Sequence, residues 1–246
     1  MPSQEQVQRL REAGRKRGFW NRGLDLERHA AQVFGNVDLR GKRVLEIGSG
    51  RGVFSMWAGI EGASRVVGLE PMASGFYDAQ NFLAEFQNML REVGVDNVEV
   101  DGSLVQDYNP PTASFDLVLS VHSLNHLNEE ACIRLHDDAD ARRTYVGIFK
   151  KIRSLMVCGG KFIAIDCSKR TLISDIGVRN PFNPDIEWNK HQPSGLWAEL
   201  LGQGGFGHTI IQHPGNTFCR HLRIQYVPRV VAYCMDGIFR IETTAI

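Results

Sequence analysis

Short apolar runs along the chain alternate with longer segments in which apolar residues repeat at helical spacing. In the clearest run, at 43–47, Val44, Leu45 and Ile47 lie between charged residues and a glycine-rich stretch. Such a run is typical of a buried strand in a parallel sheet. The predicted strands are 43–47, 65–70, 97–100, 115–120, 161–166, 208–212 and 237–242. The predicted helices are 4–17, 24–34, 53–60, 72–93, a run ending at 156, and 196–201. This alternation predicts an α/β fold.

Composition narrows the class of protein. The 246 residues suffice for one large α/β domain with a small appendage. Lys and Arg total 28 and Asp and Glu total 28, so the net charge is zero and nothing indicates nucleic acid as a partner. No apolar run reaches the length of a membrane span, and the N-terminus is polar. The five scattered cysteines contain no Cys-x-x-Cys pair, so we expect buried free thiols in a cytoplasmic protein.

Glycines at 48, 50 and 52 follow the first strand and precede a predicted helix. Glycine allows the backbone torsions of a tight turn and lets a ligand approach the main chain. A dinucleotide fingerprint would need a third glycine where this chain has Val53. A phosphate-binding loop would need a Gly-Lys-Ser/Thr ending, which is also absent from the sequence. The turn therefore predicts a ligand site of another kind.

The pattern Glu-x-Gly-x-Gly-x-Gly, which starts at Glu46, resembles the first motif of the class I S-adenosylmethionine (SAM)-dependent methyltransferases. A carboxylate suits the cationic sulfonium and amino group of SAM. The resemblance covers 41–167 by motif and extends to 246 by order of elements. It implies a three-layer Rossmann-like α/β sandwich with a seven-stranded, mostly parallel sheet and an antiparallel last strand. We therefore expect an N-terminal helical cap over 1–40 and a SAM-binding domain over 41–246, with an inserted substrate loop at about 168–192.

A second acid, Glu70, ends the second predicted strand. In Rossmann-like folds a carboxylate at this position accepts hydrogen bonds from the ribose hydroxyls. The resemblance implies that Asp101, just past the third strand, contacts the adenine amino group, although an Asp-Gly pair is also a common turn. The expected cofactor-binding residues are Glu46, Gly48, Ser49, Gly50, Gly52, Glu70, Pro71, Met72, Asp101, Gly102, Ser103, Ser120, Val121 and His122.

The end of the fourth strand faces the methyl group in the family that this chain resembles. His126 is the first candidate for a general base there and His122 the second, because histidine titrates near neutral pH. A purely structural role stays open for both histidines. We expect no metal, because this pair has no identifiable third ligand and Val121 stands where the catechol-type enzymes have an acid. The candidate substrate contacts are Trp20, Asn125, Trp188 and His191.

These expectations combine into one function. Methyl transfer is a displacement at an activated carbon, so the protein chiefly supplies alignment and dehydration. We expect transfer from SAM to an oxygen or nitrogen of a small-molecule acceptor. A protein or RNA methyltransferase, a Rossmann oxidoreductase and a SAM-binding module without turnover are the alternatives. A homodimer stays open.

Overall fold

The computed structural model describes residues 4–19, 26–71, 79–110, 114–178 and 186–246. Within these residues the strands are β1 (Arg43–Ile47), β2 (Arg65–Leu69), β3 (Val98–Asp101), β4 (Phe115–Val121), β5 (Met156–Cys167), β6 (Ile210–Gln212) and β7 (Ile238–Thr244). The helices are α1 (Gln4–Lys16), α2 (Leu26–Phe34), α3 (Val53–Ile60), α4 (Ala79–Val93), α5 (Glu129–Arg134), α6 (Ala139–Ser154), α7 (Leu172–Asp175), α8 (Ser194–Gln203), α9 (Thr217–His221) and α10 (Arg229–Cys234). Two short 3-10 helices, η2 (Leu124–His126) and η3 (Trp188–Lys190), complete them.

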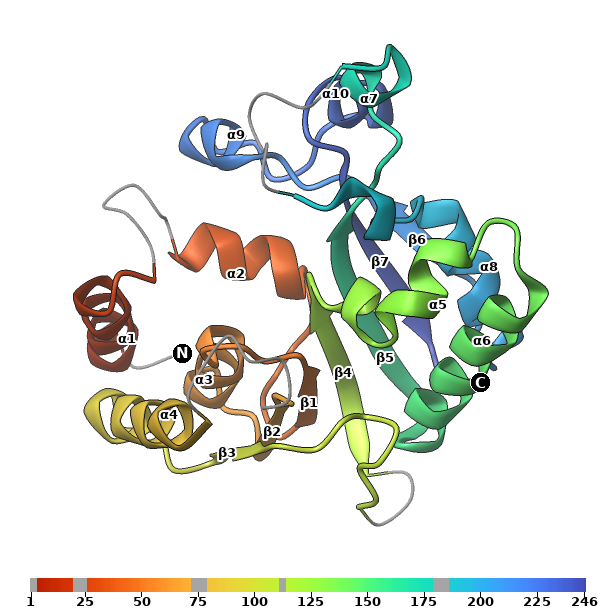
Figure 1. Cartoon of the computed structure of the whole chain (residues 1–246). Coiled ribbons are helices and arrows are strands. Elements are labelled where there is room, and N and C mark those ends of the chain that lie inside the picture. Colours follow the sequence, from red (N-terminus) through yellow and green to blue (C-terminus); the bar gives the residue numbers. More distant parts are fainter. Residues whose placement is uncertain (1–3, 20–25, 72–78, 111–113, 179–185) are drawn as a thin grey trace.

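All these strands form one sheet in the order β3-β2-β1-β4-β5-β7-β6. Strands β1 to β5 pair in parallel with their neighbours, whereas β7 runs antiparallel to both β5 and β6 (Figure 1). The expected seven-stranded sheet with an antiparallel last strand is therefore confirmed. Because the carboxyl ends of parallel strands meet at one edge, the segments after β1, β2 and β4 are brought together there.

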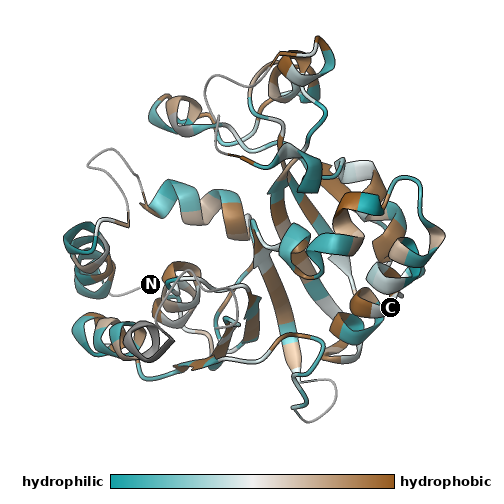
Figure 2. Ribbon diagram, viewed as in Figure 1, coloured by the Kyte–Doolittle hydropathy of each residue, from teal (hydrophilic) through white to brown (hydrophobic). Residues whose placement is uncertain are grey.

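Helices cover both faces of the sheet, and apolar side chains fill each interface (Figures 1 and 2). Successive residues of a strand point to opposite faces. Val44 accordingly packs with α1 to α4, while Leu45 and Ile47 pack with α5, α6 and α8. This arrangement is the expected three-layer sandwich, and its two cores lie on either side of β1 and β4.

The described part of the N-terminal region packs against the body of the domain. Leu10 and Leu26 are buried in the core that α1 and α2 share with α3 and α4. Phe19 follows α1, and the Arg51 guanidinium lies 4.3 Å from the centre of its ring. The N-terminal helices thus belong to one face of the sheet and end beside the glycine turn. The separate cap over 1–40 stays a prediction.

The segment after β5 is more regular than its sequence indicates. Residues 168–192 were expected to be an irregular insertion, but α7 and η3 lie within the described part of it. Helices α7, α9 and α10 gather beyond the end of β5 and the start of β7, apart from the helices that flank the sheet (Figure 1). These helices are short, so their sequences hold too few turns to show a helical period. Among the described residues, every helix is too short or too polar to cross a membrane.

Two details differ from the sequence-based expectations. β5 begins at Met156, before the predicted turn at Gly159 and Gly160, and its pairing with β4 shifts register there, so the glycines form an irregularity inside a longer strand. All five cysteines are free thiols, as expected, but Cys158 and Cys234 are exposed rather than buried.

Arg240 of β7 fastens α2 to the sheet. Its side chain is 1% exposed, and its guanidinium donates to the carbonyl oxygens of Val33 at 3.0 Å and Phe34 at 3.4 Å, at the end of α2. It also bonds Gln212 Oε1 at 2.9 Å and pairs with Glu242 at 2.8 Å. This buried cation supplies the donor for the Val33 carbonyl, which the end of the helix leaves unpaired, and a second donor for the Phe34 carbonyl, which also accepts from the Val37 amide at 3.2 Å.

We expect Arg240→Met to destabilise the fold, because the buried Val33 carbonyl loses its donor, whereas the Phe34 carbonyl keeps the Val37 amide. A buried acceptor left unpaired costs roughly 1–3 kcal/mol, and urea titration should show a free energy of unfolding lowered by about that amount. Arg40→Met is the matched control, since Arg40 pairs with Asp38 on an exposed surface. Equal effects of the two substitutions would contradict this role of Arg240.

Candidate active site

The glycine turn between β1 and α3 has left-handed backbone torsions at each of its glycines. The φ angles of Gly48, Gly50 and Gly52 are +67°, +50° and +70°. A Cβ at Gly48 would collide with the Ser123 side chain, and one at Gly52 would collide with the Phe86 ring. Torsion favours glycine at each of the three positions, and space also requires it at Gly48 and Gly52, whereas Gly50 has open space around it. The turn thus brings bare backbone to the carboxyl edge of the sheet.

Glu70, directly after β2, holds this turn in place. Its carboxylate accepts a hydrogen bond from the Gly50 backbone amide at 2.6 Å, and its own amide donates to Asp101 O at 3.0 Å. Burial raises the pKa of Glu70, whereas the Gly50 bond and the charge of His126 act in the opposite direction. The acid at the end of the second strand thus connects the segments that follow β1, β2 and β3.

A cavity of about 550 Å³ opens beside this turn. Its walls come from the ends of β1, β2 and β4, from the 103–106 segment and from the 121–129 segment. Of the expected cofactor residues, those that line it are Gly48, Gly50, Glu70, Pro71, Ser103, Val121 and His122. His126 lines the same cavity. The structure therefore brings half of the sequence-predicted cofactor residues and both candidate bases to one hollow.

Several expected cofactor residues lie outside the lining. Gly52 packs against Phe86, and Asp101 accepts a hydrogen bond from the Ser103 amide at 2.8 Å within its turn. Ser49 and Ser120 are buried in the sheet edge, and their hydroxyls have no hydrogen-bond partner among the described residues. Gly102 also does not line the cavity, and Met72 lies outside the described residues.

Glu46 faces away from the cavity. It is 2% exposed, and its carboxylate accepts a hydrogen bond from Ser55 of α3 at 2.5 Å. The alternation of side chains along β1 places it on the face opposite Leu45 and Ile47. Burial, reinforced by the charge of Glu70 and opposed by the Ser55 bonds, raises the pKa of Glu46 to about 8. At neutral pH this acid is mainly protonated and links β1 to α3.

Sequence reasoning missed several lining residues, of which Gln106, Ser123 and Glu129 carry polar groups. Gln106 Nε2 donates to Leu127 O at 2.6 Å, while its buried Oε1 has no partner among the described residues. Ser123 Oγ donates to Gly48 O and Val121 O, which fixes the segment after β4 over the turn. An acceptor without a donor, a half-buried carboxylate and bare backbone in one hollow fit a ligand such as SAM, which carries amino and hydroxyl groups.

The two histidines have different surroundings. His122 follows β4 with a φ of 53°, and its amide donates to Ile165 O at 2.7 Å. Burial lowers its pKa, and the Asp166 carboxylate opposes that shift. His126 is half exposed, with Nδ1 2.6 Å from Glu129 Oε1 and Nε2 3.3 Å from Asn125 Nδ2. A positive φ at a histidine is a strained conformation that is frequent at functional sites.

The expected substrate contacts are only partly near this cavity. Asn125 is 2% exposed, and its side chain touches His126 without lining the hollow. Trp188 and His191 pack against each other, with ring centres 5.8 Å apart, and His191 Nδ1 lies 3.1 Å from Asp166 Oδ1 at the end of β5. Trp20 lies outside the described residues. As substrate contacts, these residues stay predictions.

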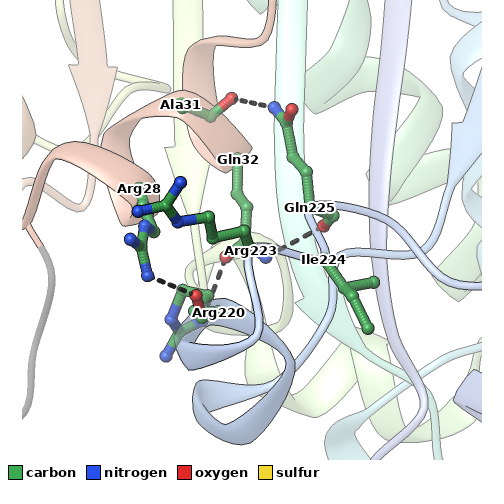
Figure 3. Close-up of a pocket in the computed structure, with 7 residues that line it drawn as sticks. All are labelled: Arg28, Ala31, Gln32, Arg220, Arg223, Ile224 and Gln225. Atoms are coloured by element: carbon green, nitrogen blue, oxygen red, sulfur yellow. Dashed lines mark hydrogen bonds between the residues drawn. The ribbon is translucent and has the colours of Figure 1, made fainter.

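A second cavity, of about 340 Å³, lies between α2 and the segment around α9 (Figure 3). Arg28 donates to Arg220 O at 2.7 Å, Arg220 donates to Gln32 Oε1 at 3.0 Å, and Gln225 donates to Ala31 O at 2.8 Å. The polar groups that line this hollow therefore attach α9 and the chain after it to α2.

Glu46→Gln tests the burial of this acid. A raised folded-state pKa means that the folded chain keeps a proton between pH 4.5 and about 8 that the unfolded chain has lost, so stability falls as pH rises through this range. The substitution should remove this pH dependence, worth a few kcal/mol at about 1.4 kcal/mol per pKa unit. Urea titrations from pH 5 to 8.5 measure it, with the exposed Glu99→Gln as control. An unchanged slope in Glu46→Gln would contradict the assignment.

Comparison with known proteins extends this account. A family model described as a methyltransferase domain matches residues 17–166. A search of curated proteins gave no match.

Solved structures share the fold. A Listeria monocytogenes protein assigned as a SAM-dependent methyltransferase is 15% identical with a TM-score of 0.59, over 90% of this chain and 98% of that one. A SAM-dependent methyltransferase from Mesorhizobium loti is 19% identical with a TM-score of 0.58, over 89% and 99%. A phosphoethanolamine N-methyltransferase from Haemonchus contortus, in complex with S-adenosylhomocysteine, is 15% identical with a TM-score of 0.59, over 92% and 52%. The family match spans β1 to β5 and the glycine turn, so the chain belongs to the methyltransferase-domain family and is a class I SAM-dependent methyltransferase.

Proposed function

We propose that the cavity beside the glycine turn carries out methyl transfer from SAM to an oxygen or nitrogen of a small-molecule acceptor. The observation that carries this proposal is the lining of the cavity. Glu70 and the bare backbone of Gly48 and Gly50 form one side, and His122 and His126 form part of the other. A cofactor-holding side and a proton-accepting side therefore share one hollow.

Bound SAM supplies a methyl group on a sulfonium, which is already activated for displacement. The residues that we assign to holding it are Gly48, Gly50, Glu70, Pro71, Ser103, Val121 and His122. Glu70 offers a half-buried carboxylate, a strong acceptor for neighbouring hydroxyl groups. Gly48 and Gly50 let a ligand lie against the main chain, because they have no side chains.

An acceptor hydroxyl or ammonium must lose a proton before or during transfer. His126 is our first assignment as the base, since its ring reaches the cavity and its Nδ1 is held by Glu129. A carboxylate on one ring nitrogen orients the ring, and the other nitrogen, 3.3 Å from Asn125 Nδ2, would accept the proton in place of that long contact. His122 is the second assignment, because it lines the same cavity, and desolvation there lowers the pKa of its imidazole.

The size and charge of the protein favour a small acceptor. The net charge is zero, which gives no electrostatic attraction for RNA. The cavity volume of about 550 Å³ falls within the usual range of pockets for small molecules. Free thiols at all five cysteines agree with a cytoplasmic location. If the protein binds the cofactor but methylates no small molecule in the screen described below, a protein acceptor or cofactor binding without turnover is favoured instead.

Glu70→Gln should weaken cofactor binding. Hydrogen bonds to a charged group contribute about 1.5–3 kcal/mol, so we expect affinity to fall roughly 10- to 100-fold. Calorimetric titration with SAM and S-adenosylhomocysteine measures this change. Glu99→Gln, an exposed acid on β3, is the control, and a melting curve shows whether the turn that Glu70 holds is still folded. Parent-like affinity in a folded Glu70→Gln variant would remove Glu70 from the cofactor site.

His126→Ala tests the base, once a screen for S-adenosylhomocysteine release from SAM and small amines, alcohols and phenols has found an acceptor. General-base catalysis contributes about 10²–10⁴-fold, so kcat should fall by that factor while cofactor affinity is retained. His136→Ala is the control, because His136 is exposed and remote from the cavity. Parent-rate turnover would exclude His126 as the base. Cofactor binding without release of product in the whole screen would favour a binding module.

A further inference from the structure

Three potential metal ligands converge at the end of β5, next to the site already described. Asp166 and Cys167 are the last two residues of the strand, and His191 follows η3. His191 Nδ1 lies 3.1 Å from Asp166 Oδ1 and 3.2 Å from Cys167 Sγ, and one donor atom from each residue lies within 4.8 Å of the others. Asp166 is 1% exposed and Cys167 7% exposed, so the cluster is enclosed.

The hydrogen bonds of Asp166 leave one acceptor unused. Its Oδ1 accepts from the Cys167 backbone amide at 2.7 Å and faces His191. Its Oδ2 is buried and has no hydrogen-bond donor among the described residues. A buried carboxylate oxygen without a partner is costly, and a bound ion or a water is among the groups that can satisfy such an atom. The orphan oxygen belongs to the same side chain that meets Cys167 and His191.

A catalytic relay does not explain this arrangement. In a nucleophile–His–acid triad the nucleophile and the acid contact opposite ring nitrogens. Here Cys167 and Asp166 both lie beside Nδ1 of His191, so the ring does not connect them in series. Three donor atoms around one common point describe a binding site for a cation instead.

We propose that Asp166, Cys167 and His191 bind a zinc ion. The set of one sulfur, one nitrogen and one oxygen suits zinc, whereas calcium and magnesium take oxygen ligands. Zn–N and Zn–O distances of about 2.0–2.1 Å and a Zn–S distance of about 2.3 Å imply ligand separations of about 3.3–3.6 Å in a tetrahedron. The observed 3.1 and 3.2 Å need only a few tenths of an ångström of adjustment.

The two segments that supply the ligands are already fastened together. The Lys169 amide donates to His191 O at 3.1 Å, so the backbone holds the histidine beside the end of β5. Such preorganisation matters because ligands that must be gathered cost conformational entropy. Three protein ligands leave a fourth position for water or another donor, the pattern of catalytic rather than purely structural zinc sites.

The zinc site would lie next to the methyl-transfer site. Val121 pairs with Ile165, and the His122 amide donates to Ile165 O, so the end of β4 is in register with Ile165, the residue before Asp166. His122 lines the cavity. The sequence-based expectation of no metal rested on two observations: the pair His122 and His126 has no third ligand, and no acid stands at the end of β4. The zinc site proposed here uses other residues. Its zinc affinity can be measured without knowing the methyl acceptor.

The proposal is tested by measuring the zinc content of the full chain. The protein is produced in medium that contains zinc, purified, dialysed extensively and then subjected to elemental analysis. We expect one zinc ion per chain and, after exchange with cobalt(II), the thiolate-to-cobalt charge-transfer absorption that a cysteine ligand produces. Cys167→Ser should lose this absorption, and His191→Ala should lose the bound zinc. Cys219→Ser is the matched control, since Cys219 is also 7% exposed but lies outside the cluster, and it should keep both.

Circular dichroism and S-adenosylhomocysteine affinity show whether each variant is folded. His191→Ala keeps the test decisive if Cys167→Ser fails to fold, because His191 lies outside the sheet. A parent protein without zinc would overturn the proposal. Equal zinc content in the parent, Cys167→Ser and His191→Ala would also overturn it, because the metal would then be held elsewhere. Failure of methyl transfer with zinc retained would affect only the proposed function.

Discussion

The active region depends on the close approach of three side chains to the bare backbone of the glycine turn, at the carboxyl edge of the sheet. Ser123 occupies the space over Gly48, Phe86 occupies the space over Gly52, and the Glu70 carboxylate caps the Gly50 amide. A side chain at Gly48 or Gly52 would collide with Ser123 or Phe86 and so push apart the segments that follow β1, β2 and β4. The same contacts leave a hollow beside the turn with exposed main chain and one half-buried acid, which is where a nucleoside-bearing ligand can lie flat against the protein.

Strand alternation divides the neighbouring acids between structure and binding. Ile47 points toward the cavity, so Glu46 points to α3, where burial keeps it protonated and bonded to Ser55. Glu70 stands beyond the end of its strand, so it reaches the cavity. At β5 the same edge gathers Asp166, Cys167 and His191 close to His122. We therefore propose two sites at this edge of the sheet: a cofactor site beside β1 and β2, and a cation site beside β5.

The order of the strands and the glycine turn could be predicted from local apolar pattern and spacing, and the antiparallel last strand from the resemblance to the methyltransferase family. Because Leu45 and Ile47 face one side of the sheet, strand alternation predicts that Glu46 faces the other side. The motif resemblance instead implies that Glu46 contacts the cofactor, and the structure agrees with the alternation. The role of Gln106 in lining the cavity could not be predicted from the sequence, because only the fold brings its segment to the cavity. The contact of Asp166 with His191 joins residues that share no local spacing rule, and α9 and α10 are too short to show a period.

The most direct test of the central claim is a crystal structure of the protein with S-adenosylhomocysteine. The account predicts the ligand in the cavity beside the glycine turn, with its ribose hydroxyls bonded to the Glu70 carboxylate and its sulfur on the side of His122. A ligand bound in another cavity, or with Glu70 still bonded only to Gly50, would contradict it.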